Sequence, residues 1–317
     1  TTPASPSPSE SSLASDEPIS PSESSLASDD QTLEDQEEEE PTPQPVVPVK
    51  TKHVRRTKIT PIKRYSYVPK VLDWAYASFA APHKAIRREL SAMVASVDEI
   101  RARRRNHKDV EAWQIVYFCE WVVDWFGPAI RAHHDSEQEL FFPFLATKLQ
   151  EQHHDLSDAH DEIIARLNAV CGICKQVLEK EGEFESLGQL QDLQEEVHCF
   201  HNFYCDVMYE EEKTMPAQVR VHFTEQEVTP ILEQMYARGG TDGLARGLLP
   251  SMMLGEEQCW AAKTSRRLSR SLSKPLRKSF SKKVMPDHLN CIVAKRDAPF
   301  LDREPDLERS QHSSHVA

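Results

Sequence analysis

The sequence predicts an all-α protein, an up-down four-helix bundle with a short extra C-terminal helix and disordered tails. From about residue 70 the apolar residues recur at intervals of three and four, as on one face of a helix. No alternating pattern of useful length indicates a strand. Four long helical patterns joined by short to moderate links are typical of a helical bundle.

Composition divides the 317 residues into three parts. Residues 1–65 are rich in Ser, Pro and acidic residues and end in a basic linker, residues 66–250 hold the helical patterns, and residues 251–317 are basic and Ser-rich. Neither flank has enough apolar residues to offset the entropy of ordering, so we expect both to be disordered. The net charge of −13 reflects the N-terminal part, because residues 1–40 contain twelve acidic residues and no Lys or Arg.

The first two helices are expected in the first half of the central part. One begins near the Pro82-His83 pair, and its apolar stripe consists of Ile86, Leu90, Met93, Val97 and Ile100. The next has the stripe Trp113, Val116, Phe118, Trp121, Val122 and Trp125. Gly127-Pro128 should kink this helix before it continues through residues 130–149.

Two more long helices follow, and then a short one. The third has the stripe Ile163, Ile164, Leu167, Val170, Cys174 and Val177. The fourth has the stripe Leu187, Leu190, Leu193, Val197, Phe200, Tyr204 and Val207. The short helix begins after Thr224, because Glu227 stands three residues later and the two form a capping box.

The cysteines argue against a disulfide framework. Their number, seven, is odd, and most stand inside helical patterns. We therefore expect small reduced thiols and an intracellular, cytoplasmic protein. No apolar run in the sequence approaches the length of a membrane span.

Histidines concentrate in the helical part, where ten of the fourteen lie between residues 83 and 222. Two of them stand where the helical pattern requires an inward residue. His83 lies three residues before Ile86 on the first stripe, and His160 lies three residues before Ile163 on the third. A lone inward histidine is usually a core residue, so only the joint pattern indicates a site.

The second and fourth helices carry a weak internal duplication. His133 and Glu137 are four residues apart, so their side chains can converge on one ion. Glu137 precedes a proline by six residues; Glu210 likewise precedes Pro216 by six, and Asp206 lies four residues before Glu210. Two hairpins related in this way would bring imidazole and carboxylate groups to the bundle centre. Such donors suit iron or another transition metal.

Four stretches of this sequence resemble hemerythrin-like, or HHE cation-binding, domains. They are HHDSEQELFFPFL at 133–145, PHKAIRREL at 82–90, DAHDEIIARL at 158–167 and DVMYEEEKTMP at 206–216. The resemblance covers roughly residues 70–235. It implies a four-helix bundle that holds two non-haem iron ions bridged by carboxylates. The ligands that it implies are His83, His133, Glu137, His160 and Glu210.

One position departs from the family pattern, and it leaves two registers open. Asp206 stands where the family has histidine, although a carboxylate can still ligate iron. Alternatively, His201 with Asp206 resembles the last helix of the oxygen-carrying hemerythrins. The repeated proline spacing favours the register with Glu210. The residues expected on solvated faces are His134, Glu139, Glu211 and Glu212.

The resemblance implies a protein that binds O₂ or senses oxygen, iron or redox state, and not an enzyme. The alternative is an interaction module with a degenerate metal site that acts through its charged tails. The basic, Ser-rich run at 264–283 is typical of a solvated tail, and the alternative is that it binds an anionic membrane or protein partner. Its single aromatic residue, Phe280, disfavours nucleic acid, because base stacking needs aromatic side chains.

Overall fold

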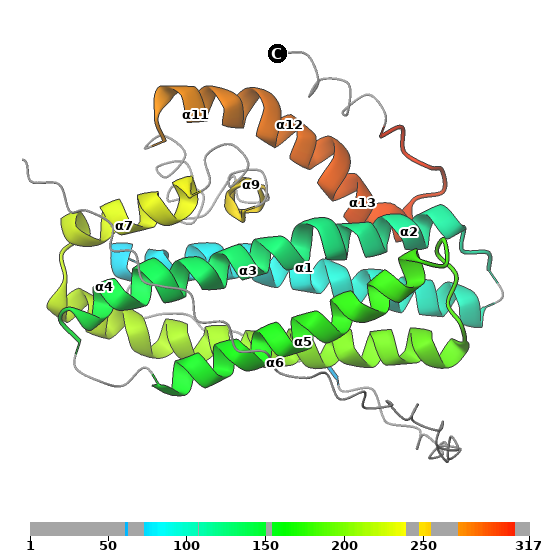
Figure 1. The fold of residues 1–317 in the computed structure, drawn as a ribbon, viewed down its shortest axis with the longest axis horizontal. Helices are drawn as coiled ribbons and strands as arrows, with labels where there is room; N and C mark the ends of the chain where they lie inside the picture. The colour runs from blue at the N-terminus through cyan, green and yellow to red at the C-terminus, as the bar shows by residue number, and fades with distance from the viewer. Residues whose placement is uncertain are drawn as a thin grey trace, which may run out of the picture. The chain divides into compact units, whose positions relative to one another are not determined.

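The computed structural model describes residues 61–62, 73–106, 108–149, 154–238, 247–254 and 272–307. All of them belong to the unit that spans residues 56–317. Every regular element in these ranges is a helix (Figure 1), so the all-α prediction is confirmed for them. None of these helices is long and apolar enough to cross a membrane. Apart from residues 61 and 62, the predicted disordered region 1–65 lies outside the described residues.

Helix α1 (Trp74–Arg105) is the first long helix and includes the predicted stripe. The Asp73 side chain caps it by accepting a hydrogen bond from the Tyr76 N–H at 3.1 Å. The stripe residues are almost completely buried, and they face α6 (Leu187–His222), along which α1 packs. The periodicity of the sequence thus places the side of α1 that carries His83 inside the protein.

The second predicted helix is continuous from Ala112 to Ala146 but contains two π-helical turns. Its parts are α2 (Ala112–Glu120), η1 (Trp121–Phe126), α3 (Gly127–Ser136), η2 (Glu137–Phe141) and α4 (Phe142–Ala146). The π turn η1 ends two residues before Pro128, and η2 ends two residues before Pro143. A proline inside a helix lacks an N–H and crowds the carbonyl four residues earlier, and a wider turn before it relieves both problems.

Helices α5 (His154–Leu178) and α6 complete the set of long helices. In Figure 1, α1, α3, α5 and α6 lie alongside one another; α6 contacts both α1 and α5, and α5 also contacts α2 and α3. Gly182, between α5 and α6, has φ of +90°, and a Cβ there would lie 2.7 Å from the Ala112 carbonyl oxygen. This close approach requires glycine at the turn.

The side chains between these helices form one large apolar cluster. Its largest fully buried members include Trp121, Tyr204, Phe118, Phe126 and Phe200. Four cysteines of the described residues are buried and free: Cys119, Cys171, Cys174 and Cys205. This burial agrees with the expectation of small core thiols.

The short helix α7 (Glu225–Ala237) begins where the sequence predicts it. The Thr224 hydroxyl accepts a hydrogen bond from the Glu227 N–H, and the Glu227 carboxylate accepts one from the Thr224 N–H at 2.8 Å. The predicted capping box is therefore confirmed. Helix α7 packs against η2 and α1, close to the polar part of the second helix.

The C-terminal part differs from the expected disordered tail. After α9 (Leu249–Met253), residues 274–300 are helical. Their elements are α11 (Lys274–Ser279), η3 (Phe280–Val284), α12 (Met285–Asp287), η4 (His288–Val293), α13 (Ala294–Asp297) and η5 (Ala298–Phe300).

This C-terminal segment packs on the long helices. Helix α13 and η5 contact both α1 and α2, and Phe280, Val284 and His288 are buried. These three residues are four apart in sequence, so they form one helical stripe beneath a basic outer face. The basic and Ser-rich composition concealed this stripe, and the prediction of a tail from residue 251 is wrong for residues 272–307.

Candidate metal centre

Seven histidine and glutamate side chains meet between the long helices. They are His83 of α1, His133 and His134 of α3, Glu137 of η2, His160 of α5, and Glu211 and Glu212 of α6. Each is between 1% and 8% exposed. Ionisable side chains are rarely buried to this degree unless they pair with one another or bind a metal.

Glu137 lies at the centre of the cluster and presents one oxygen to each neighbouring histidine. Its Oε1 is 3.2 Å from His133 Nε2, and its Oε2 is 3.6 Å from His134 Nδ1. Two groups of possible ligand atoms share this carboxylate: one adds His83 and His133, and the other adds His134 and His160. Within each group the ligand atoms lie within 4.8 Å of one another.

Glu211 holds the other two histidines in the same way. Its Oε2 is 3.2 Å from His83 Nε2, and its Oε1 accepts a hydrogen bond from His160 Nε2 at 3.0 Å. Each of the two carboxylates therefore spans two imidazoles. Glu212 binds the opposite side of His83 at 3.0 Å and also accepts a hydrogen bond from Arg87 Nη1 at 2.7 Å.

Two polar side chains at the cluster have no hydrogen-bond partner among the described residues. Both ring nitrogens of His134 are buried without one, and so is the hydroxyl of Tyr204. The Tyr204 ring lies 5.5 Å from the His134 ring, measured between centroids. A buried polar group without a partner costs about 1–3 kcal/mol, so these atoms need an explanation.

The charge states divide the histidines into two kinds. Burial lowers the pKa of His133 well below its ordinary value, and nearby His134 lowers it further. Burial together with repulsion from His160 lowers the pKa of His134 to about 3. Burial also opposes charge on His83, but hydrogen bonds to Glu211 and Glu212 outweigh it and raise its pKa to about 9.

The pKa values of the two shared carboxylates are shifted in opposite directions. Burial and the negative charge of Glu211 raise the pKa of Glu137 to about 8. For Glu211, burial opposes ionisation, yet hydrogen bonds from His160 and His83 hold its pKa below the ordinary value. At neutral pH the cluster thus contains neutral His133 and His134, a protonated Glu137 and an ionised Glu211.

The structure brings together four of the predicted residues, His83, His133, Glu137 and His160. It does not bring Glu210 to them. The Glu210 side chain is 56% exposed and pairs with Lys213 at 3.2 Å, so the inward register predicted for it is wrong. Asp206, four residues earlier, is half-buried and belongs to neither ligand group.

The one-residue error in α6 has a physical cause. Glu137 and Pro143 are six residues apart, but η2 lies between them and adds one residue to its turn. Helix α6 has no such turn, so the equivalent of Glu137 is five residues before Pro216, at Glu211. Four residues before Glu211 the chain has Val207, so α6 contributes no imidazole there.

Of the four residues expected on solvated faces, one is exposed and three are buried. Glu139 is exposed and pairs with Arg238, but His134, Glu211 and Glu212 are buried in the cluster. The apolar spacing of α6 contained a signal for Glu211, which lies three residues after the buried Met208 and four before the buried Met215.

The alternative register with His201 is not part of the cluster. The His201 ring is buried, but its contacts are Asn202 at 3.3 Å and the Cys205 thiol at 3.9 Å. Neither of the two possible ligand groups among the described residues includes it.

No family model matches this sequence, and comparisons with curated proteins and with solved structures find no match either. The chain is thus characterised by its own geometry. It is an all-helical protein, over its described residues, with buried clusters of histidine and glutamate side chains that could hold a metal ion.

Proposed function

We propose that this chain is a hemerythrin-like metal protein that holds two iron ions and binds O₂ or senses oxygen, iron or redox state. In this proposal α1, the segment α2–α4, α5 and α6 form an up-down four-helix bundle around the centre. The ligands are His83, His133, His134, Glu137, His160 and Glu211.

The observation that carries the proposal is the shared carboxylate. Glu137 belongs to both possible ligand groups and presents a different oxygen to each side. Glu211 likewise presents one oxygen to His83 and the other to His160. Two carboxylates that each span two imidazoles favour a pair of ions over a single ion.

The residues present fit such a pair. His133 and His134 are neutral, which is the form in which imidazole ligates a metal. Both nitrogens of His134 lack a hydrogen-bond partner among the described residues, and a cation beside the ring would bind one of them. Imidazole and carboxylate donors together suit iron, although they also suit other transition metals.

Bound iron would supply a redox couple and a place for O₂. The chain supplies the surroundings: Glu211 provides negative charge, Glu137 would add a second charge once a bound cation displaced its proton, and the apolar cluster surrounds them. Glu212 contacts His83 from the side opposite Glu211, and Arg87 in turn binds Glu212. These second contacts fix the orientation of the His83 ring, as in other histidine–metal sites.

A second candidate is an interaction module whose buried cluster is only structural. It is favoured by the ion pairs of Glu211, which joins His83 and His160 without any metal. In that case the exposed cations of residues 274–283 would bind an anionic membrane or protein partner. The nitrogens of His134, which make no hydrogen bond within the described part of the chain, have no role in this alternative.

The test is metal analysis of the purified full chain produced with iron supplied, together with its absorption spectrum. We expect roughly two iron ions per chain. The variant Glu137→Gln should lose most of them, because an amide cannot carry the charge that spans both groups. Glu139→Gln, two residues later on the exposed face, should keep them. Wild-type protein that is metal-free and equally stable would favour the interaction module.

A further inference from the structure

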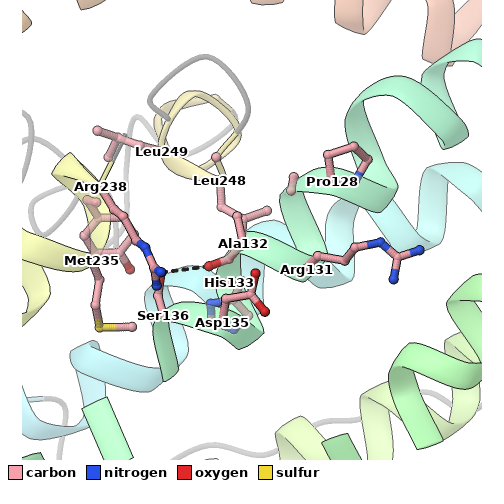
Figure 2. Close-up of a pocket in the computed structure, with 13 residues that line it drawn as sticks. Pro128, Arg131, Ala132, His133, Asp135, Ser136, Met235, Arg238, Leu248 and Leu249 are labelled. Atoms are coloured by element: carbon pink, nitrogen blue, oxygen red, sulfur yellow. Dashed lines mark hydrogen bonds between the residues drawn. The ribbon is translucent and has the colours of Figure 1, made fainter. Parts of the chain in front are cut away.

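A cavity of about 400 Å³ lies between α3 and the shorter helices α7 and α9 (Figure 2). Helix α3 forms one side of it, and Met235, Tyr236, Leu248 and Leu249 are on the other. Figure 2 shows Leu248 and Leu249 on the side opposite Ala132 and His133. The cavity thus lies directly beside a residue of the candidate metal centre.

His133 connects the cavity to the centre. His133 lines the cavity, and its Nε2 is 3.2 Å from Glu137 Oε1 inside the cluster. Tyr236 of α7 lines the cavity as well. A molecule in the cavity would touch a proposed ligand of the metal.

The size of the cavity argues against a ligand as small as O₂ alone. A water molecule occupies about 30 Å³ in the liquid, so about 400 Å³ corresponds to more than ten waters. Cavities of about 300–1,000 Å³ are those that enclose organic ligands. A diatomic gas would fill only a small part of this space.

The lining indicates the polarity of the ligand. Leu248 and Leu249 are buried, and together with Met235 they provide an apolar wall. The two cations of the lining are engaged elsewhere: Arg238 pairs with Glu139, and Arg131 donates to Asn168 Oδ1 at 2.5 Å.

Asp135 also lines the cavity, but it is exposed, so water can solvate its carboxylate; the other groups left to face a ligand are neutral. Figure 2 shows Arg131 pointing away from the other lining residues. The Ser136 hydroxyl donates to the Ala132 carbonyl oxygen at 2.7 Å. Burying a charged group against such a wall would be costly, whereas one oxygen able to hydrogen-bond would not be.

We propose that this cavity binds a neutral, mainly apolar organic molecule with one hydrogen-bonding oxygen, such as a phenol or an alcohol, against His133. The inference rests on the proposed function in one respect, the presence of a metal at the other face of His133. Such a ligand would cover the part of His133 that borders the cavity. Through His133 it would couple an organic signal or substrate to the metal.

The test uses 4-butylphenol as the probe and calorimetric titration of the full chain without metal. We expect saturable binding to the wild type and at least tenfold weaker binding of 4-phenylbutyrate, which has a charged carboxylate. Ala132→Trp, which places a large ring in the cavity wall, should weaken binding of 4-butylphenol at least tenfold. The matched control is Ala169→Trp, an exposed position on α5 outside the cavity, and it should bind like the wild type.

A second measurement separates this inference from the metal proposal. In protein loaded with Co²⁺, 4-butylphenol should change the visible absorption of the metal, because His133 lies between the two. If the wild type shows no saturable binding, or if Ala132→Trp binds like the wild type, the inference is overturned and the metal proposal is untouched. Binding without a spectral change would overturn the position against His133. Protein that takes up no Co²⁺ but binds the probe in the Ala132-sensitive manner would sink the metal proposal and support the ligand site.

Discussion

His134 shows at the scale of one residue how burial and function oppose each other. Its ring is 4% exposed, its neighbours are His160 and Tyr204, and neither nitrogen has a hydrogen-bond partner among the described residues. A residue that only filled the core would be better replaced by an apolar side chain. The imidazole is explained if it ligates a metal.

Replacing His134 by Leu should therefore separate stability from metal binding. Without metal, His134→Leu should raise the free energy of unfolding by about 1 kcal/mol, because an unsatisfied buried polar group is removed. The iron content should fall at the same time. Chemical denaturation and metal analysis measure the two effects.

The matched control is His288→Leu. His288 is also buried, and neither of its nitrogens has a hydrogen-bond partner among the residues that the structure describes, but it packs on Trp125 outside the cluster. This variant should be stabilised in the same way and keep its iron. An unchanged iron content in His134→Leu would remove His134 from the ligand set.

Asp73 is a second informative residue, since it caps α1 and also pairs with Arg220 of α6. Arg220 donates to the Asp73 carboxylate through Nε at 2.5 Å and through Nη2 at 2.9 Å. These hydrogen bonds lower the pKa of Asp73, against a smaller opposing effect of burial. The carboxylate thus joins the start of one long helix to the end of another.

We expect Asp73→Asn to keep the cap and lose the ion pair, and Asp73→Ala to lose both. At pH 7 the alanine variant should be about 1 kcal/mol less stable than the asparagine variant. Because the pKa of Asp73 is lowered by folding, its contribution is complete above the unfolded value, about 3.9, and is lost as the pH falls through the folded value. The difference between wild type and Asp73→Asn, measured by denaturation, should shrink below about pH 4. A difference that stays constant to pH 2 would contradict this assignment.

At the scale of elements, the second helix has the π turn η2 just before its proline Pro143, whereas α6 has no π turn before Pro216. The extra residue in η2 shifts the positions that precede Pro143 relative to those that precede Pro216. It is the reason that Glu211, and not Glu210, faces Glu137. Successive residues of an α-helix are rotated by about 100° about its axis, so a shift of one residue can move a side chain from the core to the solvent.

The register of α6 predicts opposite results for two adjacent substitutions. Glu211→Gln should reduce the iron content strongly, because the charge that joins His83 and His160 is lost. Glu210→Gln should leave it unchanged, because that side chain is exposed and pairs with Lys213. Metal analysis of both variants decides the matter. Loss of iron from Glu210→Gln alone would restore the register inferred from proline spacing.

At the scale of the whole molecule, a buried ion pair fastens the C-terminal segment to α1. Arg296 Nη1 of α13 lies 3.1 Å from Glu89 Oε2, and the Glu89 side chain is 1% exposed. Arg88 and the Ser251 hydroxyl of α9 also contact this carboxylate. The segment from 272 to 307 is thus joined to the long helices by polar as well as apolar contacts.

Removing Arg296 should therefore cost far more than removing its neighbour. Arg296→Ala leaves a buried carboxylate with one cation fewer and should destabilise the protein by about 3 kcal/mol. Lys295 pairs with Glu120 at 2.7 Å on a more exposed surface, so Lys295→Ala should cost less than about 1 kcal/mol. Thermal and chemical unfolding of both variants measure the difference. Equal effects would mean that the segment does not depend on this pair.

Much of the molecule follows from local patterns in the sequence. The periodicity of apolar residues was sufficient for the all-helical class and for the inward position of His83 and His160, because one face of a helix must be buried. The pair His133 and Glu137 and the capping box at Thr224 also follow, since both depend only on residues three or four apart.

Other features were decided by tertiary structure. The comparison of proline spacings pointed to the wrong side of α6, because the π turn η2 in the second helix shifts that spacing and forms only in the folded helix. The burial of His134 depends on its neighbours from α5 and α6, His160 and Tyr204. Residues 272–307 depend for their helical structure on the surface of α1 and α2, because the short apolar stripe of this segment is stable only where another part of the protein covers it. Local sequence determines which face of a helix is apolar, but only the packing of distant segments determines which polar groups that face encloses.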